Sequence, residues 1–140
     1  MVGASSDDAE FGRALALLGG VGREPTPRQL ALLDGIGQGL ATLEKAKIGT
    51  RVVSMPCREW FDAQSKSYKE KVLPAAVRAR VSVEAATPFG WREVVGDAGE
   101  IVGIDHFGAS ADAVTLYEKF GITPAAVVKA AKASIKKAKG

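Results

Sequence analysis

The 140-residue sequence has one cysteine, few aromatic residues and no long apolar run, and each shortage excludes a class of protein. With Cys57 alone the chain cannot form an internal disulfide, which excludes a disulfide-stapled secreted domain. No apolar stretch approaches the roughly 18 residues of a membrane span. The first eight residues lack the basic start and apolar stretch of a secretory signal. We therefore expect a cytoplasmic protein that does not cross a membrane.

The positive charge of the chain gathers at its C-terminal end. The formal net charge is +3, and the last 12 residues hold five lysines and no acid: Lys129, Lys132, Lys136, Lys137 and Lys139. No aromatic residue alternates with these lysines to stack a base, so we do not expect nucleic acid as a partner. The preferred interpretation is the solvated end of a helix, where cations also suit the helix dipole.

From residue 51 onward, predicted strands alternate with predicted helices. Short β-branched runs predict strands at 51–55, 80–84 and 101–104. Helical spacing and capping residues predict helices at 59–73, 88–95, 111–120 and from Pro124 to the end. Alternating strands and helices predict an α/β fold of three layers, with a mainly parallel sheet and helices on both faces.

Residues 1–50 read differently, as a helical N-terminal segment. One helix is predicted to start near Asp7, and a second to run from about residue 27 to Lys47. Gly35, Gly37 and Gly39 interrupt the second, each at a cost of about 1 kcal/mol against alanine. That helix therefore needs tertiary support, or its glycines permit close approach of a neighbouring backbone. We divide the chain into 1–50 and an α/β domain at 51–140.

His106 and Ser110 are the candidate binding residues. They follow the strand predicted at 101–104, and α/β sheets usually bind ligands at the carboxyl ends of their strands. Ser110 would also lie at a helix N-terminus, which favours an anion or a phosphate group. The simpler alternative, which we prefer, makes Ser110 a helix cap and His106 a loop residue, because the sequence gives His106 no base or metal partner.

Other reactive groups have simpler explanations. Cys57 follows a predicted strand and precedes a helix, but no base for a nucleophile is visible nearby, so we interpret it as structural. Glu59 with Asp62, and Glu93 with Asp97, have a spacing that is common on solvated helix faces. The sequence therefore predicts no catalytic residue and no metal ligand.

Seven segments, in order and without large gaps, resemble the C-terminal domain of a transketolase. They are Arg51–Cys57, Val72–Val77, Ala79–Ala85, Phe89–Trp91, Val95–Gly99, Phe107–Ala111 and Tyr117–Thr123. Each segment alone is weak, and the ordered set is specific. The resemblance covers about 90 of the 140 residues and places the family-like domain at about 51–138. Residues 1–50 depart from the family pattern, because the apolar strand that opens such a domain is missing.

The resemblance implies a protein related to the transfer of two-carbon ketol units between sugar phosphates, in the pentose phosphate pathway. In the family, thiamine diphosphate and a divalent metal bind to two preceding domains, which this sequence lacks. Gly96-Asp97-Ala98 departs from the Gly-Asp-Gly metal motif. We therefore expect no cofactor on this chain, no activity from it alone, and a structural or interface role as a subunit or fragment. Its expected partner is a second copy or transketolase catalytic domains, and the alternative is a small anion- or phosphate-binding module.

Overall fold

The structure is a computed structural model that describes residues 37–140. The helix predicted near Asp7 and most of the second predicted helix lie outside the described residues. Residues 37–45 are helical, as predicted, and Leu43 within them is only 1% exposed. A Cβ atom added at Gly39 would lie 3.6 Å from the carbonyl oxygen of Pro124, so this helix packs closely on the start of the last helix.

Two short parallel strands form the sheet of the described residues. β1 (Val81–Val83) pairs with β2 (Glu100–Val102), with Val81 opposite Glu100 and Val83 opposite Val102. The predicted strands at 80–84 and 101–104, and their parallel direction, are thereby confirmed to within two residues. Val81 and Val102 form a buried cluster with Ile122, so the core lies between the strands and the C-terminal helix.

The strand predicted at 51–55 is wrong, because only residues 51 and 52 make isolated bridges. The Arg51 guanidinium donates to the carbonyl oxygens of Lys71 and Val72, at 3.0 and 3.3 Å, and holds the start of the segment beside a helix end. Pro56 then removes a backbone donor that a longer strand would need.

The helix predicted at 59–73 is two helices, α3 (Arg58–Asp62) and α4 (Lys66–Val72). The reason is Ser65, whose hydroxyl accepts the backbone N–H of Tyr68 at 3.2 Å and starts a new helix. The helix predicted at 88–95 is shorter, α5 (Trp91–Val95), because Gly90 takes a left-handed conformation with φ of +79°.

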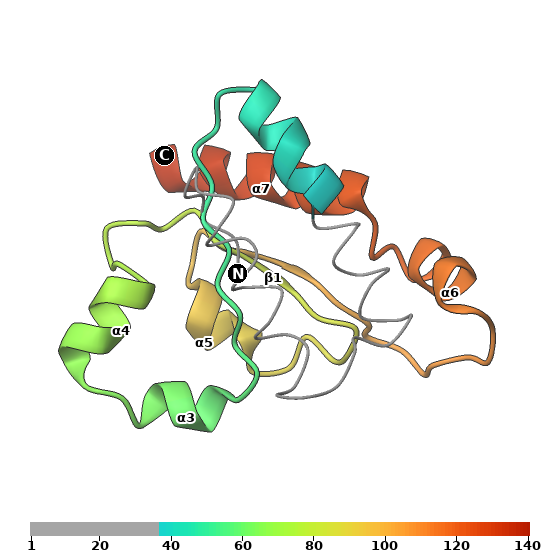
Figure 1. Cartoon of the computed structure of the whole chain (residues 1–140), viewed down its shortest axis with the longest axis horizontal. Helices are drawn as coiled ribbons and strands as arrows, with labels where there is room; N and C mark the ends of the chain where they lie inside the picture. The colour runs from blue at the N-terminus through green and yellow to red at the C-terminus, as the bar shows by residue number, and fades with distance from the viewer. Residues whose placement is uncertain (1–36) are drawn as a thin grey trace.

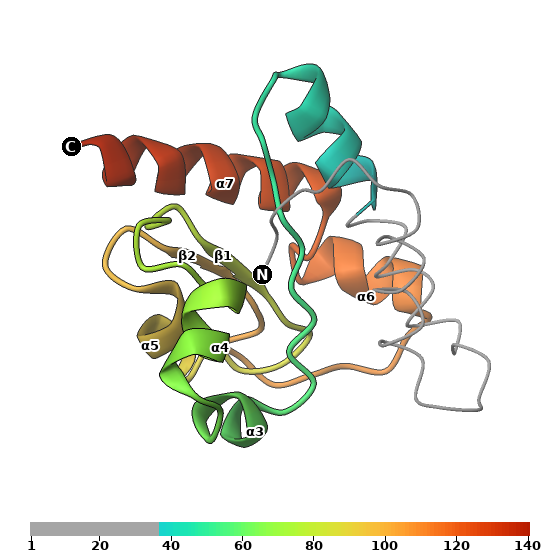
Figure 2. The ribbon, with the colours of Figure 1, turned by 60° about the vertical axis from the view of Figure 1, so that its left-hand side comes forward.

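The two C-terminal helices match their prediction closely. α6 (Ala113–Lys119) ends before Gly121, which has a φ of +72°. α7 (Pro124–Lys139) begins where predicted, and the Thr123 hydroxyl accepts the N–H of Ala126 at 3.2 Å. α7 packs on both strands and α5 also contacts both. In Figures 1 and 2, α7 crosses one side of the sheet while α4 and α5 lie on the other.

Candidate functional site

The carboxyl ends of β1 and β2, where the sequence places its candidate ligand residues, lead into two loops that are fastened together. The N–H of Glu84 donates to the Val102 carbonyl at 3.0 Å, and the N–H of Ile104 donates to the Ala86 carbonyl at 2.8 Å. Gly103 allows this contact, since a Cβ atom there would lie 3.1 Å from the Ala86 oxygen. The loops after β1 and β2 therefore form one continuous edge, seen below the sheet in Figure 1.

His106 lies on this edge and is held by two neighbours. Its Nδ1 lies 2.8 Å from the carbonyl oxygen of Phe107, and its ring meets the ring of Phe120 edge to face at 4.8 Å between centroids. The backbone carbonyl can only accept, so Nδ1 carries the proton of this hydrogen bond. His106 thus packs the loop against the end of α6.

Ser110 is not the cap of α6, so the simpler alternative for this residue is wrong. The N-cap is Asp112, whose carboxylate accepts the N–H of Thr115 at 3.0 Å and its hydroxyl at 2.7 Å. Those two hydrogen bonds, the backbone one first, lower the pKa of Asp112. A carboxylate already occupies the helix start where an anion was expected. The sequence missed this because Asp and Ser are both good caps and lie two residues apart.

Cys57 is half-buried and donates its S–H to the carboxylate of Glu59 at 3.3 Å. The sequence offered no base for this thiol, and the structure places a carboxylate beside it. A hydrogen bond to its own backbone N–H, and then the one from Cys57, lower the pKa of Glu59. A carboxyl group with a lowered pKa is a poor base, so the geometry does not favour a nucleophilic thiolate.

Arg58 ties the start of α3 to the loop before α5. Its Nη1 donates to the Gly90 carbonyl at 2.7 Å, while its other nitrogens pair with Glu93 and, at 3.6 Å, with Asp62. The hydrogen bond to Glu93 is the main cause of a raised Arg58 pKa. Glu93 and Asp62 both face this guanidinium, whereas Asp97 pairs with Arg78, so Glu93 and Asp97 do not form a carboxylate pair.

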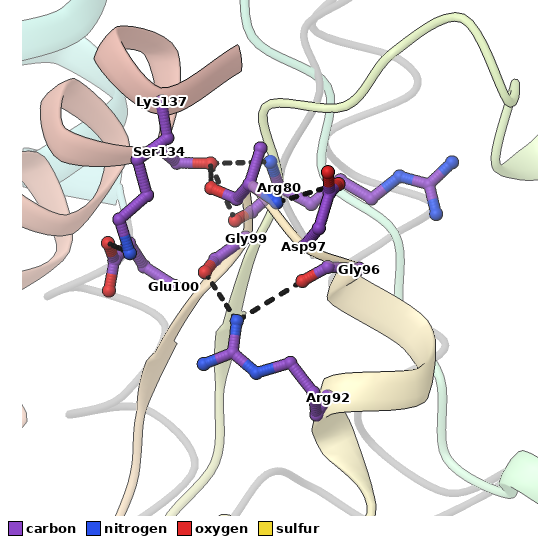
Figure 3. A network of polar contacts seen from close by, with 9 residues as sticks. Arg80, Arg92, Gly96, Asp97, Gly99, Glu100, Ser134 and Lys137 are labelled. Carbon is purple, nitrogen blue, oxygen red and sulfur yellow. Dashed lines mark hydrogen bonds and ion pairs between the residues drawn. The ribbon is translucent and has the colours of Figure 1, made fainter. Parts of the chain in front are cut away.

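A polar network ties α7 to the amino ends of both strands (Figure 3). Ser134 is fully buried, and its hydroxyl accepts the N–H of Arg80 at 2.9 Å. The same oxygen lies 2.8 Å from the Ala98 carbonyl, to which it donates, and 3.1 Å from the Arg80 carbonyl. One side chain of α7 thereby contacts the residue before β1 and the loop before β2.

Further charged groups of the same region bind backbone carbonyls and carboxylates. Arg92 donates to the carbonyls of Gly96 and Gly99, at 3.1 and 2.8 Å, which fixes the turn between α5 and β2 (Figure 3). Lys137 pairs with Glu100 at 2.7 Å. Sequence reasoning missed Ser134, although it falls on the apolar stripe of α7, and a polar residue on a buried stripe needs a partner.

An apolar cavity of about 300 Å³ lies between α7, the helix at 37–45 and the segments around residues 50 and 75. Its lining is mostly aliphatic and includes Leu43, Val53, Val81, Val127 and Ile135. Arg80 is one of the residues that line the cavity. Its guanidinium donates to backbone carbonyls, including those of Pro74 and Val94 at 2.9 Å each. The cavity thus offers volume and apolar contact, with no unbound charge from Arg80.

Within residues 37–140 no helix is both long and apolar enough to span a bilayer. The same residues hold no group of three or more His, Cys, Asp or Glu side chains that is placed to bind a metal ion.

Parallel strands, the helices that pack on them and the joined carboxyl-edge loops define an α/β domain. The model of the family described as "Transketolase-like TK C-terminal domain" matches residues 36–123. The chain therefore belongs to the transketolase family and corresponds to its C-terminal domain. The match begins before Arg51 and so takes in the helix at 37–45.

Known transketolases confirm the family. A chloroplastic transketolase of Craterostigma plantagineum is 59% identical over 90 residues, which cover 64% of this chain and 17% of that protein. Transketolase-1, chloroplastic, of Arabidopsis thaliana is 48% identical over 127 residues, which cover 91% of this chain and 16% of that protein. The solved transketolase of Leishmania mexicana superposes with a TM-score of 0.60 at 42% identity, over 75% of this chain and 15% of that one.

The chain spans less than a fifth of the length of these relatives. Thiamine diphosphate would need a divalent metal, and the described residue closest to the family motif, Asp97, is poorly suited to bind one. Its carboxylate accepts from the Arg78 guanidinium at 2.6 Å and from the N–H of Ala98 at 2.8 Å. A cation would have to displace that guanidinium, so these residues do not fit the cofactor's metal.

Proposed function

We propose that this chain serves as the C-terminal domain of a transketolase and supplies structure and interface to ketol transfer, with no catalytic group of its own. The observation that carries the proposal is the extent of the match. The C-terminal-domain model covers residues 36–123, while the chain covers only 16% of Arabidopsis transketolase-1. Two-carbon transfer between sugar phosphates would then depend on thiamine diphosphate bound to other domains, with none bound here.

Three reactive side chains support this assignment, because each is engaged in contacts within the domain. Cys57 donates to Glu59, His106 packs on Phe120, and Asp97 pairs with Arg78. Catalysis needs a nucleophile or base that is free to meet a substrate. These three groups are held by contacts within the domain.

The proposal carries three further expectations with it. The two observed strands would belong to a larger parallel sheet in a three-layer arrangement. The division into a helical segment at 1–50 and an α/β domain at 51–140 stays a prediction. A cytoplasmic location stays a prediction as well. Anion binding at His106 and Ser110 belongs to the alternative function, a small anion- or phosphate-binding module.

A ketol-transfer assay tests the functional assignment. We expect the purified chain, supplied with thiamine diphosphate and Mg²⁺, to transfer no ketol unit between sugar phosphates. A transketolase truncated before the matched segment should gain activity or stability when the chain is added. Cofactor-dependent transfer by the chain alone would overturn the proposal, and so would a complete failure to affect the truncated enzyme.

A further inference from the structure

Two phenylalanines on the carboxyl edge of the sheet are almost fully exposed. Phe89, in the loop after β1, is 88% exposed, and Phe107, in the loop after β2, is 98% exposed. We call this pair the aromatic edge. A phenylalanine ring presents about 150–250 Å² of mostly apolar surface, so both rings keep a large apolar area in water. The two rings lie on loops that are joined by a hydrogen bond, and exposed apolar area of this kind can mark an interaction site.

The backbone on which the rings stand is fixed. Ile104 and Ala86 join the two loops by a hydrogen bond of 2.8 Å, three residues from each ring. Next to Phe89, the Gly90 carbonyl accepts from Arg58 at 2.7 Å. Next to Phe107, the ring of His106 packs on Phe120. The rings therefore project from an ordered edge, and a binding partner would have little backbone to order.

The charges near the aromatic edge favour a protein over a polyanion. Glu84 follows β1 directly, Asp105 lies three residues after the end of β2, and Asp112 caps α6. The lysine-rich part of α7 lies instead toward the opposite ends of the strands, where Lys137 pairs with Glu100 at the start of β2. Nucleic acid and anionic lipid surfaces need cations beside the apolar contact. Here carboxylates follow both strands, and the guanidinium beside Phe89, that of Arg58, is already paired with Glu93 and Asp62.

The length of the relatives is the basis for the partner proposed here. The domain is only 15% of the solved Leishmania transketolase chain, so more than four fifths of such a polypeptide lies outside the match. We propose that the aromatic edge, Phe89 with Phe107, is the surface through which this chain docks on the remaining domains of a transketolase. This inference rests on the proposed function and adds to it the residues that make the contact.

A binding measurement tests the proposal with the whole 140-residue chain. The probe is Arabidopsis transketolase-1, truncated before the matched segment and first shown to be folded and monodisperse. We expect the chain to bind it, and the double variant Phe89→Ser/Phe107→Ser to bind at least about tenfold more weakly, as is typical of aromatic anchors. The matched control is Val77→Ser, 52% exposed on the loop before β1, which should bind like the unmodified chain.

The outcomes separate the two proposals. Because both rings are exposed, the double variant should keep its melting temperature and circular dichroism. Equal binding by the double variant would overturn the aromatic edge and leave the proposed function standing. No binding by the unmodified chain would overturn both. Self-association that the double variant abolishes, without binding to the truncated enzyme, would make a second copy the partner and overturn the choice of partner made here.

Discussion

The hydroxyl of Ser134, in the middle of α7, and the backbone of Arg80, just before β1, form a reciprocal pair 54 residues apart. Ser134 Oγ lies 2.9 Å from the Arg80 nitrogen and 3.1 Å from its carbonyl oxygen. Helix and sheet are usually joined by apolar packing alone. Here a buried hydroxyl sets how far along its axis α7 sits against the strands.

Replacing Ser134 with alanine should therefore destabilise the domain by about 1–3 kcal/mol, because it leaves buried backbone groups of Arg80 and Ala98 without a partner. Urea unfolding measures the loss. The matched control is Ser110→Ala in the exposed loop before α6, which should change the free energy of unfolding by less than about 0.5 kcal/mol. Equal effects of the two substitutions would show that the buried hydroxyl contributes nothing special.

Gly90→Ala should cost roughly 1–3 kcal/mol for two separable reasons. Gly90 has a φ of +79°, where an L side chain is strained, and an added Cβ atom would lie 2.7 Å from Arg58 Nη1. Thermal unfolding of Gly90→Ala, alone and combined with Arg58→Ala, separates backbone strain from the clash. Gly108→Ala is the control, since a Cβ atom at Gly108 meets nothing within 4 Å. Equal destabilisation by Gly108→Ala would show that neither the positive φ of Gly90 nor its contact with Arg58 causes the loss.

Acid should destabilise the domain through Asp97. The hydrogen bond from the Arg78 side chain is the main cause that holds its pKa below the usual 3.8. A lowered folded-state pKa gives stability that is present above pH 3.8 and is lost as the pH falls through the folded value. Melting temperatures measured from about pH 6 down to pH 2 should fall less steeply for Asp97→Asn and for Arg78→Gln than for the unmodified chain. Unchanged slopes in both variants would contradict this role.

Phosphate should leave the loop at 105–112 undisturbed. The Asp112 carboxylate caps α6 where an anion would bind, and the His106 ring is engaged with Phe107 and Phe120. Amide chemical shifts recorded during a titration with inorganic phosphate provide the measurement. Saturable shifts confined to this loop would instead support the anion-binding alternative at His106 and Ser110.

Self-association is a separate question for the whole chain. The exposed rings of Phe89 and Phe107 should bind an apolar dye, and sedimentation across a hundredfold concentration range should show association. Phe89→Ser/Phe107→Ser should reduce both signals. A compact monomer at every concentration, without dye binding, would contradict the expectation.

Local signals in the sequence predicted those features that neighbouring residues decide. Thr123 and Pro124 start α7 because cap and first-turn preferences act within four residues. Gly121 ends α6 because its φ is positive. The break between α3 and α4 is also decided locally, because Ser65 caps α4 through the N–H of Tyr68. The prediction missed this cap because the residues on both sides of it are polar and suit one continuous helix.

The sequence by itself determined the family, the parallel β1–β2 pair and the start of α7. Apolar runs, caps and ordered motifs are properties of neighbouring residues, so they can be read without the tertiary structure. Only the tertiary structure decided which polar residues become partners. Ser134 meets Arg80 and Arg58 meets Gly90 across 54 and 32 positions, distances over which no spacing rule operates. It also decided that residues 51 and 52 make only isolated bridges, since a strand exists only where another backbone lies beside it.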